Sequence, residues 1–265
     1  MLVLLPPSET KAAPPRRGPS LDLAALSFPE LTAHREAVLD ALLRVSRGPA
    51  TKALATLKLS PGQSAELARN DVLTEAVTSK VSDLYTGVLY DALDAATLSA
   101  PAKRRANRQL VVASALFGAL RWSDRVPAYR LSAGVTLPRI GAVTTSWKQP
   151  LGEVLPAAAG RGLILDLRSS GYAAMWQPTG ALAERTLAVR VLHERVPGDP
   201  GSRAVVSHFN KATKGRLVRD LLESGANPAT PEALAALLTG PDRVAELDEL
   251  RAGRPRRLDL VVTEI

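Results

Sequence analysis

The chain has no cysteine among its 265 residues and only three histidines. Without cysteine it can form no disulfide, no cysteine-ligated zinc or iron–sulfur site and no thiol nucleophile. A transition-metal site would have to depend mainly on carboxylates, and no HExxH-like or clustered carboxylate pattern is present. The sequence therefore predicts neither a metal site nor a bound cofactor.

Aromatic residues are also scarce, at 4% of the chain, whereas leucine and alanine are abundant. This composition favours helices packed on a sheet over an aromatic-rich β-sandwich. Binding of single-stranded nucleic acid by stacked aromatic side chains is poorly supported for the same reason.

Long apolar runs are missing as well, because no stretch approaches the ~20 residues that are needed to span a bilayer. The first apolar run, residues 2–5, has no basic region before it and is too short for a signal peptide. We therefore expect a cytoplasmic protein with no membrane partner.

Positive charge is in excess, with 34 Lys and Arg against 26 Asp and Glu and a net charge of +8. Such an excess permits binding to a polyanion such as DNA. It does not establish that activity, because an arginine-rich composition is also typical of GC-rich coding sequences.

Apolar and alternating segments separated by helical tracts predict strands at residues 2–5, 110–113, 163–167, 186–193, 203–208 and 258–262. Ser27 is expected to cap a helix that has Pro29 in its first turn. Further helices are expected at about residues 144–159, 213–224 and 231–238. We predict an α/β (mixed α+β) fold with a mixed central sheet and flanking helices. Residues 1–265 are expected to form one domain, with a helical elaboration at about residues 28–80.

Polar loops follow two of the predicted strands. Residues 2–5 stop at two prolines and are followed by Ser8, Glu9, Thr10 and Lys11. Residues 163–167 are followed by a loop, residues 168–172, that contains two serines and a tyrosine. Ligands tend to bind outside the carboxyl ends of strands in open α/β sheets, so both loops are candidate binding segments. The alternative is an ordinary solvated turn.

A lysine-bearing segment, residues 207–219, runs from a predicted strand into a helix. Projected at about 100° per residue, Lys211 and Lys214 fall on or beside the apolar face of that helix, and Arg216 points away. Lysine near a helix N-terminus opposes the helix dipole, and an anion bound there would reconcile the two. The alternative is that both lysines extend to solvent.

Three further polar residues, Arg121, Tyr129 and Arg130, lie in segments that are otherwise apolar enough to face the core. Arginine is rarely buried without an anionic partner, so each arginine is expected to pair with a carboxylate or to bind a ligand. The pattern does not decide between these roles.

A turn at residues 58–65 lies between two short predicted helices. Backbone N–H groups near Ser60, Gly62 and Gln63 could contact phosphate without reading a base sequence. Such turns also often do no more than join two helices. A basic helix beginning at Pro101 adds further positive charge, and no Walker loop, GxGxxG or GxSxG motif is present.

Six of these segments resemble, in order and spacing, motifs of the YaaA-type peroxide stress protein family. They are the opening MLVLLPPSETK, the YTG at residues 85–87, the block at 114–121, the YRL at 129–131, the SSGY at 169–172 and the block at 209–219. Some members carry lysine at the position of Glu9, which leaves Lys11 as the neighbouring cation.

This resemblance implies a family-specific α/β fold with a helix–hairpin–helix element, which maps to residues 59–65. It also implies a positively charged cleft that binds double-stranded or branched DNA, and a role in the response to hydrogen peroxide.

Two functions follow from the residues and the resemblance together. The first is sequence-nonspecific binding of double-stranded or branched DNA in oxidative-stress protection. The second is an enzyme or binder of a nucleotide or another small phosphorylated ligand, in a pocket lined by Lys, Arg and Tyr; the sequence does not decide whether there is catalysis. The candidate DNA- or anion-binding residues are Lys11, Tyr85, Arg121, Tyr129, Arg130, Ser169, Ser170, Tyr172, Lys211, Lys214 and Arg216, with Ser60, Gly62 and Gln63 as the hairpin contacts.

Overall fold

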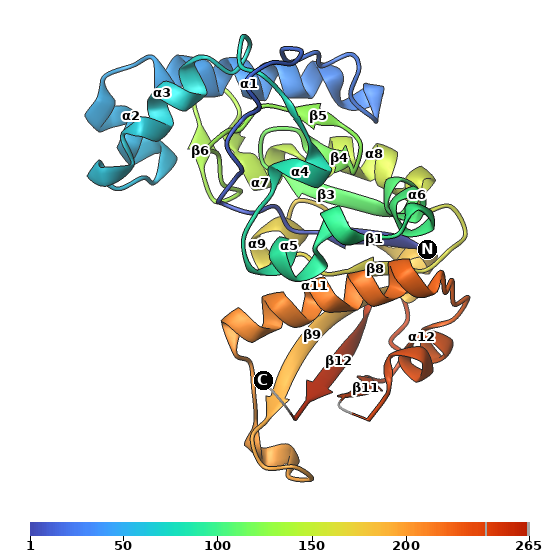
Figure 1. Ribbon diagram of the computed structural model, residues 1–265. Helices are drawn as coiled ribbons and strands as arrows, with labels where there is room; N and C mark the ends of the chain where they lie inside the picture. The colour runs from blue at the N-terminus through green and yellow to red at the C-terminus, as the bar shows by residue number, and fades with distance from the viewer. Residues whose placement is uncertain (242, 264–265) are drawn as a thin grey trace.

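A central mixed sheet organises the protein, whose computed structural model describes residues 1–241 and 243–263 (Figure 1). In this described part, eight strands form the sheet: β1 (Leu2–Leu5), β3 (Leu110–Ser114), β4 (Gly118–Arg121), β8 (Ile164–Asp166), β9 (Thr186–Glu194), β10 (Arg203–Ala204), β11 (Arg243–Leu247) and β12 (Arg256–Val262). Their order is β11-β12-β9-β8-β1-β3-β4, and β10 pairs with β9. Two small ribbons pair β2 (Ser79–Lys80) with β5 (Arg125–Val126) and β6 (Thr136–Leu137) with β7 (Gly141–Ala142).

Helices surround this sheet (Figure 1). They are α1 (Thr32–Ser46), α2 (Ala50–Leu57), α3 (Ala65–Asp71), α4 (Val81–Leu84), α5 (Val88–Leu93), α6 (Ala100–Gln109), α7 (Val143–Ser146), α8 (Lys148–Ala159), α9 (Ser170–Ala173), α10 (Gly180–Glu184), α11 (Ser207–Ser224) and α12 (Pro231–Leu238), with short 3-10 turns η1 (Pro29–Leu31), η2 (Pro61–Gln63), η3 (Ala95–Thr97) and η4 (Pro200–Ser202). In the described part of the chain, no helix is both long and apolar enough to cross a membrane.

The centre of the sheet is parallel. Strand β1 lies between β3 and β8, and it runs parallel to both. All four of its residues are at most 2% exposed. A continuous apolar run is what a parallel strand covered on both faces requires. The edge strands β4 and β11 are antiparallel to their neighbours, so the predicted α/β fold with a mixed sheet and flanking helices is confirmed.

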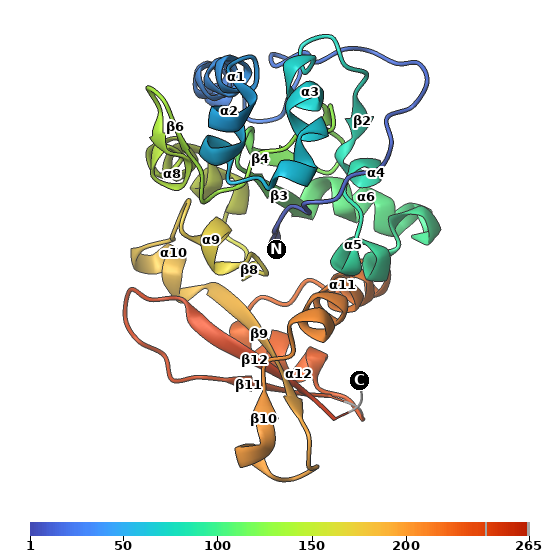
Figure 2. The ribbon, with the colours of Figure 1, turned by 90° about the vertical axis from the view of Figure 1, so that its left-hand side faces the viewer.

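The long helix α11 ties the second half of the chain to the first by packing against α5 (Figures 1 and 2). At Gly215 the two helices approach so closely that a Cβ atom would lie 2.2 Å from the carbonyl oxygen of Leu89. Glycine is therefore required sterically at this crossing rather than for its backbone freedom.

Three local predictions are wrong. The strand expected at residues 203–208 ends at Ala204, because only Arg203 and Ala204 find partners at the end of β9, and α11 already begins at Ser207. The helix was expected to start at residue 213, so its predicted start is six residues too late. The expected cap at Ser27 is also absent, since its hydroxyl instead donates to the Asp124 carboxylate at 2.7 Å.

Candidate functional site

The carboxyl ends of β1, β3 and β8 meet at one edge of the sheet because the three strands are parallel neighbours. Leu4 pairs with Asp166, and the Leu167 N–H donates to the Leu4 carbonyl at 2.9 Å. The two polar loops that follow β1 and β8 therefore lie side by side. The sequence marked both loops as candidate binding segments, and the parallel pairing of β1 with β8 places them next to each other.

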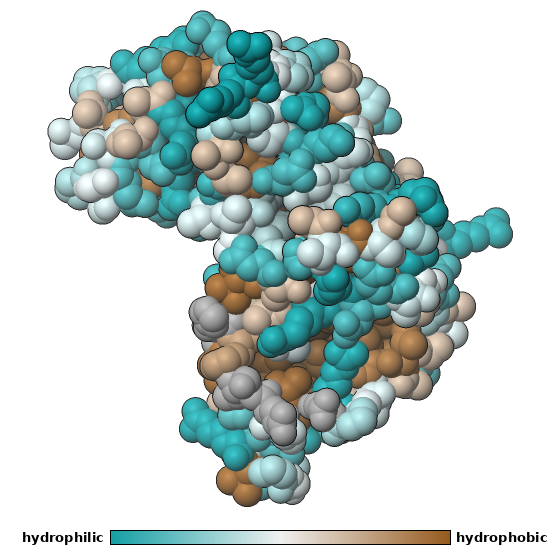
Figure 3. Space-filling view, in the orientation of Figure 1, coloured by the Kyte–Doolittle hydropathy of each residue, from teal (hydrophilic) through white to brown (hydrophobic). Residues whose placement is uncertain are grey.

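This edge opens onto a notch in the molecular surface. In the space-filling view the outline is hollowed on its left side, between the part that carries α2 and α3 and the part that carries β9 and β10 (Figure 3). The view from that side places the turn between α2 and α3 above the notch and the first turns of α11 below it (Figure 2).

Lys11 is half-buried at this edge. Its backbone forms a β-bridge with Tyr85, and its Nζ donates to the Ser8 carbonyl at 3.1 Å. The same Nζ lies 4.3 Å from the ring centroid of Tyr129 and 5.4 Å from that of Tyr85. Burial lowers the pKa of Lys11 to about 8, although the nearby Glu9 carboxylate opposes the shift. A fraction of Lys11 is therefore a neutral amine near neutral pH.

Buried tyrosines pack next to Lys11, whose Nζ lies over the rings of Tyr85 and Tyr129. The hydroxyl groups of Tyr85 and Tyr129 are hydrogen-bonded at 2.9 Å, and Tyr129 is also bonded to the Ser114 hydroxyl at 2.7 Å. Tyr90 stacks on Tyr85, with 5.3 Å between ring centroids, and donates to the Pro6 carbonyl at 2.6 Å. Burial raises the pKa of each tyrosine, so all three stay protonated at neutral pH. They act as hydrogen-bonding groups and not as bases.

Arg130 closes the group of side chains around Lys11. Its guanidinium forms an ion pair with the exposed Glu9 carboxylate. Its backbone is held by the fully buried Asn70 of α3, which accepts from the Arg130 N–H at 2.8 Å and donates to its carbonyl at 2.9 Å. Burial is the main cause that raises the pKa of Tyr172, and the charges of Glu9 and Arg130 act on it in opposite directions. Tyr172 therefore lies within electrostatic reach of Glu9 and Arg130.

Lys214 holds the segment that follows β8. Its buried Nζ donates to the Leu167 carbonyl at 3.2 Å, and burial lowers the pKa of its ammonium group while Asp166 opposes the shift. The neighbouring Arg168 donates to both oxygens of Asp166, at 2.9 and 2.7 Å, and to the Trp176 carbonyl. These contacts hold the end of β8 in place, and they leave Ser169 and Ser170 exposed at the start of α9.

Two of the predicted cations are placed differently from expectation. Lys211 is exposed rather than directed inward, and it lies in the second turn of α11, which begins at Ser207. Arg121 pairs with Val111 at the amino end of β3, so it lies at the opposite end of the sheet from Lys11. Its guanidinium donates to the Arg108 carbonyl at 2.8 Å and lies over the Phe28 ring. Arg121 and Lys11 therefore lie at opposite ends of the sheet. Arg216 is exposed, as expected.

The turn predicted at residues 58–65 lies between α2 and α3 and contains η2. The side-chain oxygen of Gln63 accepts from the backbone N–H of Ser60 at 3.0 Å and from its hydroxyl at 3.2 Å, which closes the turn. Around Gly62 no other atom lies within 4 Å of the place that a Cβ would take. The turn is thus rigid and open on one side, and its contact with phosphate stays a prediction.

Basic helix α6 lies away from the notch. It leads directly into the amino end of β3, whereas Lys11 lies beyond the carboxyl end of β1, the parallel neighbour of β3. Its Arg105 donates to the Leu222 carbonyl of α11 at 2.6 Å and so connects two helices. The charge of α6 is therefore separate from the Lys11 group.

Comparison with known proteins agrees with the resemblance seen in the motifs. The model of the family described as "Peroxide stress protein YaaA" matches residues 1–240. The chain belongs to this family. A UPF0246 protein of Streptomyces coelicolor is 52% identical over 266 residues, covering 100% of both chains. A UPF0246 protein of Corynebacterium efficiens is 42% identical over 264 residues, which are 99% of this chain and 100% of the relative.

Family membership confirms the reading of the six motifs as a set. In this YaaA-family protein, four of them meet near the carboxyl edge of the sheet: the opening segment, the YTG, the YRL and the SSGY. Tyr90 and Asn70 belong to the same edge and were not singled out from the sequence. Tyr90 follows Tyr85 by five residues in an apolar helix, so its pattern is that of an ordinary core residue.

Proposed function

We propose that this YaaA-family protein protects against hydrogen peroxide by binding the backbone of double-stranded or branched DNA, without sequence specificity, along the notch. The observation that carries the proposal is the exposed positive charge at its two borders. Lys58 ends α2 above the notch, and Lys211 lies in the second turn of α11 below it (Figure 2). Neither side chain forms an ion pair within residues 1–241 and 243–263. Unpaired cations of this kind are suited to sequence-neutral phosphate contacts.

The test is binding of a duplex and of a four-way junction across a range of salt concentrations. Each neutralised phosphate contributes about −0.9 to the slope of log K against log salt. The variant K58A/K211A/R216A is expected to bind about tenfold or more weakly and to show a less steep slope. The variant K103A/R104A/R108A removes the same charge from α6 and is expected to bind like the wild type. Absence of binding at low salt, or equal losses in both variants, would contradict the proposal.

A second candidate function, binding or turnover of a nucleotide or another small phosphorylated ligand, is favoured by the group around Lys11. The Lys11 amine, the Tyr172 hydroxyl and the Arg130 guanidinium come from three separate segments, and simple contact with a DNA backbone does not need this convergence. Thermal-shift measurements with nucleotides should then show stabilisation that K11A abolishes and K211A retains. A screen without any stabilisation counts against this second function.

A further inference from the structure

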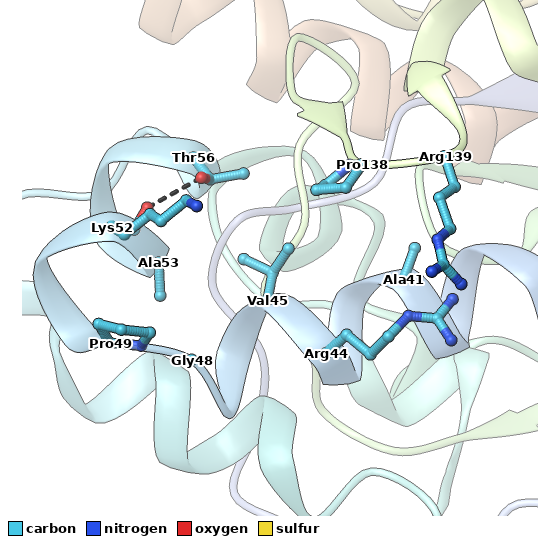
Figure 4. A pocket seen from close by; sticks show the side chains of 10 residues that line it. All are labelled: Ala41, Arg44, Val45, Gly48, Pro49, Lys52, Ala53, Thr56, Pro138 and Arg139. Carbon is cyan, nitrogen blue, oxygen red and sulfur yellow. Dashed lines mark hydrogen bonds between the residues drawn. The ribbon is translucent and has the colours of Figure 1, made fainter.

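A second candidate site lies in the helical elaboration. A cavity of about 260 Å³ is enclosed by α1, α2 and the turn between β6 and β7 (Figure 4). It shares no lining residue with the group around Lys11. Neither the motifs of the family nor the proposed function uses it.

Three cations line this cavity, and no carboxylate does. They are Arg44 from α1, Lys52 from α2 and Arg139 from the β6–β7 turn. Within the described part of the chain, their charged groups form no hydrogen bond or ion pair. The guanidinium groups of Arg44 and Arg139 are turned toward one another (Figure 4). Like charges brought together in this way repel, unless an anion lies between them.

The backbone around the cavity is consistent with an anion. Helix α2 begins at the cavity wall, and its N-cap residue, Pro49, provides no side-chain cap. The positive end of the α2 dipole is therefore not offset by a capping oxygen. Arg139 has a φ of 68°, a left-handed conformation in which a side chain other than glycine is uncommon. A turn built only to connect two strands would favour glycine there.

We propose that this cavity binds a phosphate group. Arg44 and Arg139 present planar forks that match the oxygens of phosphate, and Lys52 adds a compact charge from α2. Ligand pockets are commonly about 300–1,000 Å³, so a cavity of about 260 Å³ suits a phosphate with a small attached group. Apolar side chains, among them Val45, Ala53 and Pro138, form the remaining wall and would contact that group.

The primary experiment is a titration with inorganic phosphate at constant ionic strength, followed by NMR of the backbone amides. Saturable shifts are expected at the start of α2 and in the β6–β7 turn. Binding should weaken about tenfold or more in R44A/R139A, because both forks are lost. It should be retained in R104A/R108A, which removes two exposed arginines from α6. All four side chains are exposed, so both variants are expected to fold.

Three results would overturn the proposal: no saturable binding, unchanged affinity in R44A/R139A, or an equal loss in both variants. The variant R44K/R139K adds a test of the fork geometry. It keeps the charge but loses the planar forks, so its affinity should lie between those of the wild type and the alanine variant.

The source of the phosphate is then decided by competition against inorganic phosphate. Displacement by a duplex with 5′-phosphates, but not by one with 5′-hydroxyls, identifies a DNA end as the ligand. Equal displacement by both identifies the internal backbone, and displacement by neither leaves a small phosphorylated molecule. The inorganic phosphate titration does not depend on DNA binding at the notch, so the two proposals can fail separately.

Discussion

The Lys11 ammonium lies over the Tyr129 ring and donates to the Ser8 carbonyl, and no carboxylate of residues 1–241 and 243–263 forms an ion pair with it. The carboxylate that precedes it in the predicted loop, Glu9, is used by Arg130 instead. At the scale of single residues, the site therefore combines a partly deprotonated lysine with an arginine whose charge is already balanced. An anionic ligand would be attracted to Arg130 only after displacing Glu9.

Lys11 makes the stability of the protein depend on pH in a defined direction. Its pKa is about 8 in the folded state, against 10.5 for an ordinary lysine. Between these values the unfolded chain binds a proton that the folded chain lacks, so this residue's contribution to stability rises with pH. We expect K11M to be more stable than the wild type at pH 7 by roughly 2 kcal/mol, and this difference to shrink from pH 8 to pH 10.5.

Urea unfolding at several pH values measures this difference. Subtraction of the variant from the wild type cancels the titration of groups that the two proteins share. The matched control is K211M, which makes the same substitution at an exposed lysine. A flat difference for K11M would mean that Lys11 is as well solvated in the folded protein as in the unfolded chain.

At the scale of elements, α11 is the part of the fold in which pattern and structure differ most. The alternation at residues 203–208 predicted a longer strand, yet the paired portion is only β10. The helix already begins at Ser207. Lys214 is buried, as its place beside the apolar face predicted, whereas Lys211 is exposed. Helix boundaries are set by the packing partners as much as by local propensity, and here the partner is α5.

The crossing of α11 and α5 predicts a large effect of G215A. Alanine is favoured over glycine inside a helix by about 1 kcal/mol. Its Cβ would, however, lie 2.2 Å from the Leu89 carbonyl oxygen, so the helices must separate. We expect a net loss of roughly 2–3 kcal/mol in the free energy of unfolding, measured by urea denaturation.

The control for this prediction is G171A in α9. Nothing lies within 4 Å of the position that its Cβ would take, so this variant should be neutral or slightly stabilised. If G215A were as stable as G171A, the close approach of the two helices would not exist in solution.

At the scale of the whole molecule, a single sheet runs through both halves of the chain. Strand β8 pairs with β1 on one side and with β9 on the other, and α11 packs against α5 across the same division. The second half contributes β9, β11 and β12 together with α11 and α12 (Figure 1). If the halves separated, β8 and β9 would each lose a hydrogen-bonded neighbour and become exposed edge strands.

This shared sheet predicts that the protein unfolds in one cooperative transition. All three tryptophans, at positions 122, 147 and 176, precede β9, so their fluorescence follows the first half, whereas far-UV circular dichroism follows the whole chain. The two transitions should coincide in urea. A second transition seen only by circular dichroism would show that the half with β9 and β12 unfolds independently, against the expectation of one domain.

The sequence was sufficient for the fold class and for most elements. The apolar runs at residues 2–5 and 163–167 predicted buried strands, and the polar loops after them predicted the edge where Lys11 and Tyr172 lie. Strand β11 was missed because its five residues, Arg243–Leu247, include two charged ones and none of the five is buried, so it has no core-facing apolar run. The buried Arg35 was also missed, since a helical arginine usually faces solvent. Here it donates to four backbone carbonyls, including that of Phe117.

What the sequence by itself determined are properties set by residues close together in the chain: the central strands β1, β3, β8, β9 and β12, several helices and the ordered motifs of the YaaA family. Only the tertiary structure decided the properties that depend on strand order and packing. In the structure, β1 lies between β3 and β8, and the half-buried Lys11 lies over the ring of Tyr129. Arg121 lies at the opposite end of the sheet, and Arg44 and Arg139 line the same cavity. The physical reason is that the burial of a side chain and its distance from other charges depend on segments far apart in the sequence, which local sequence patterns do not predict.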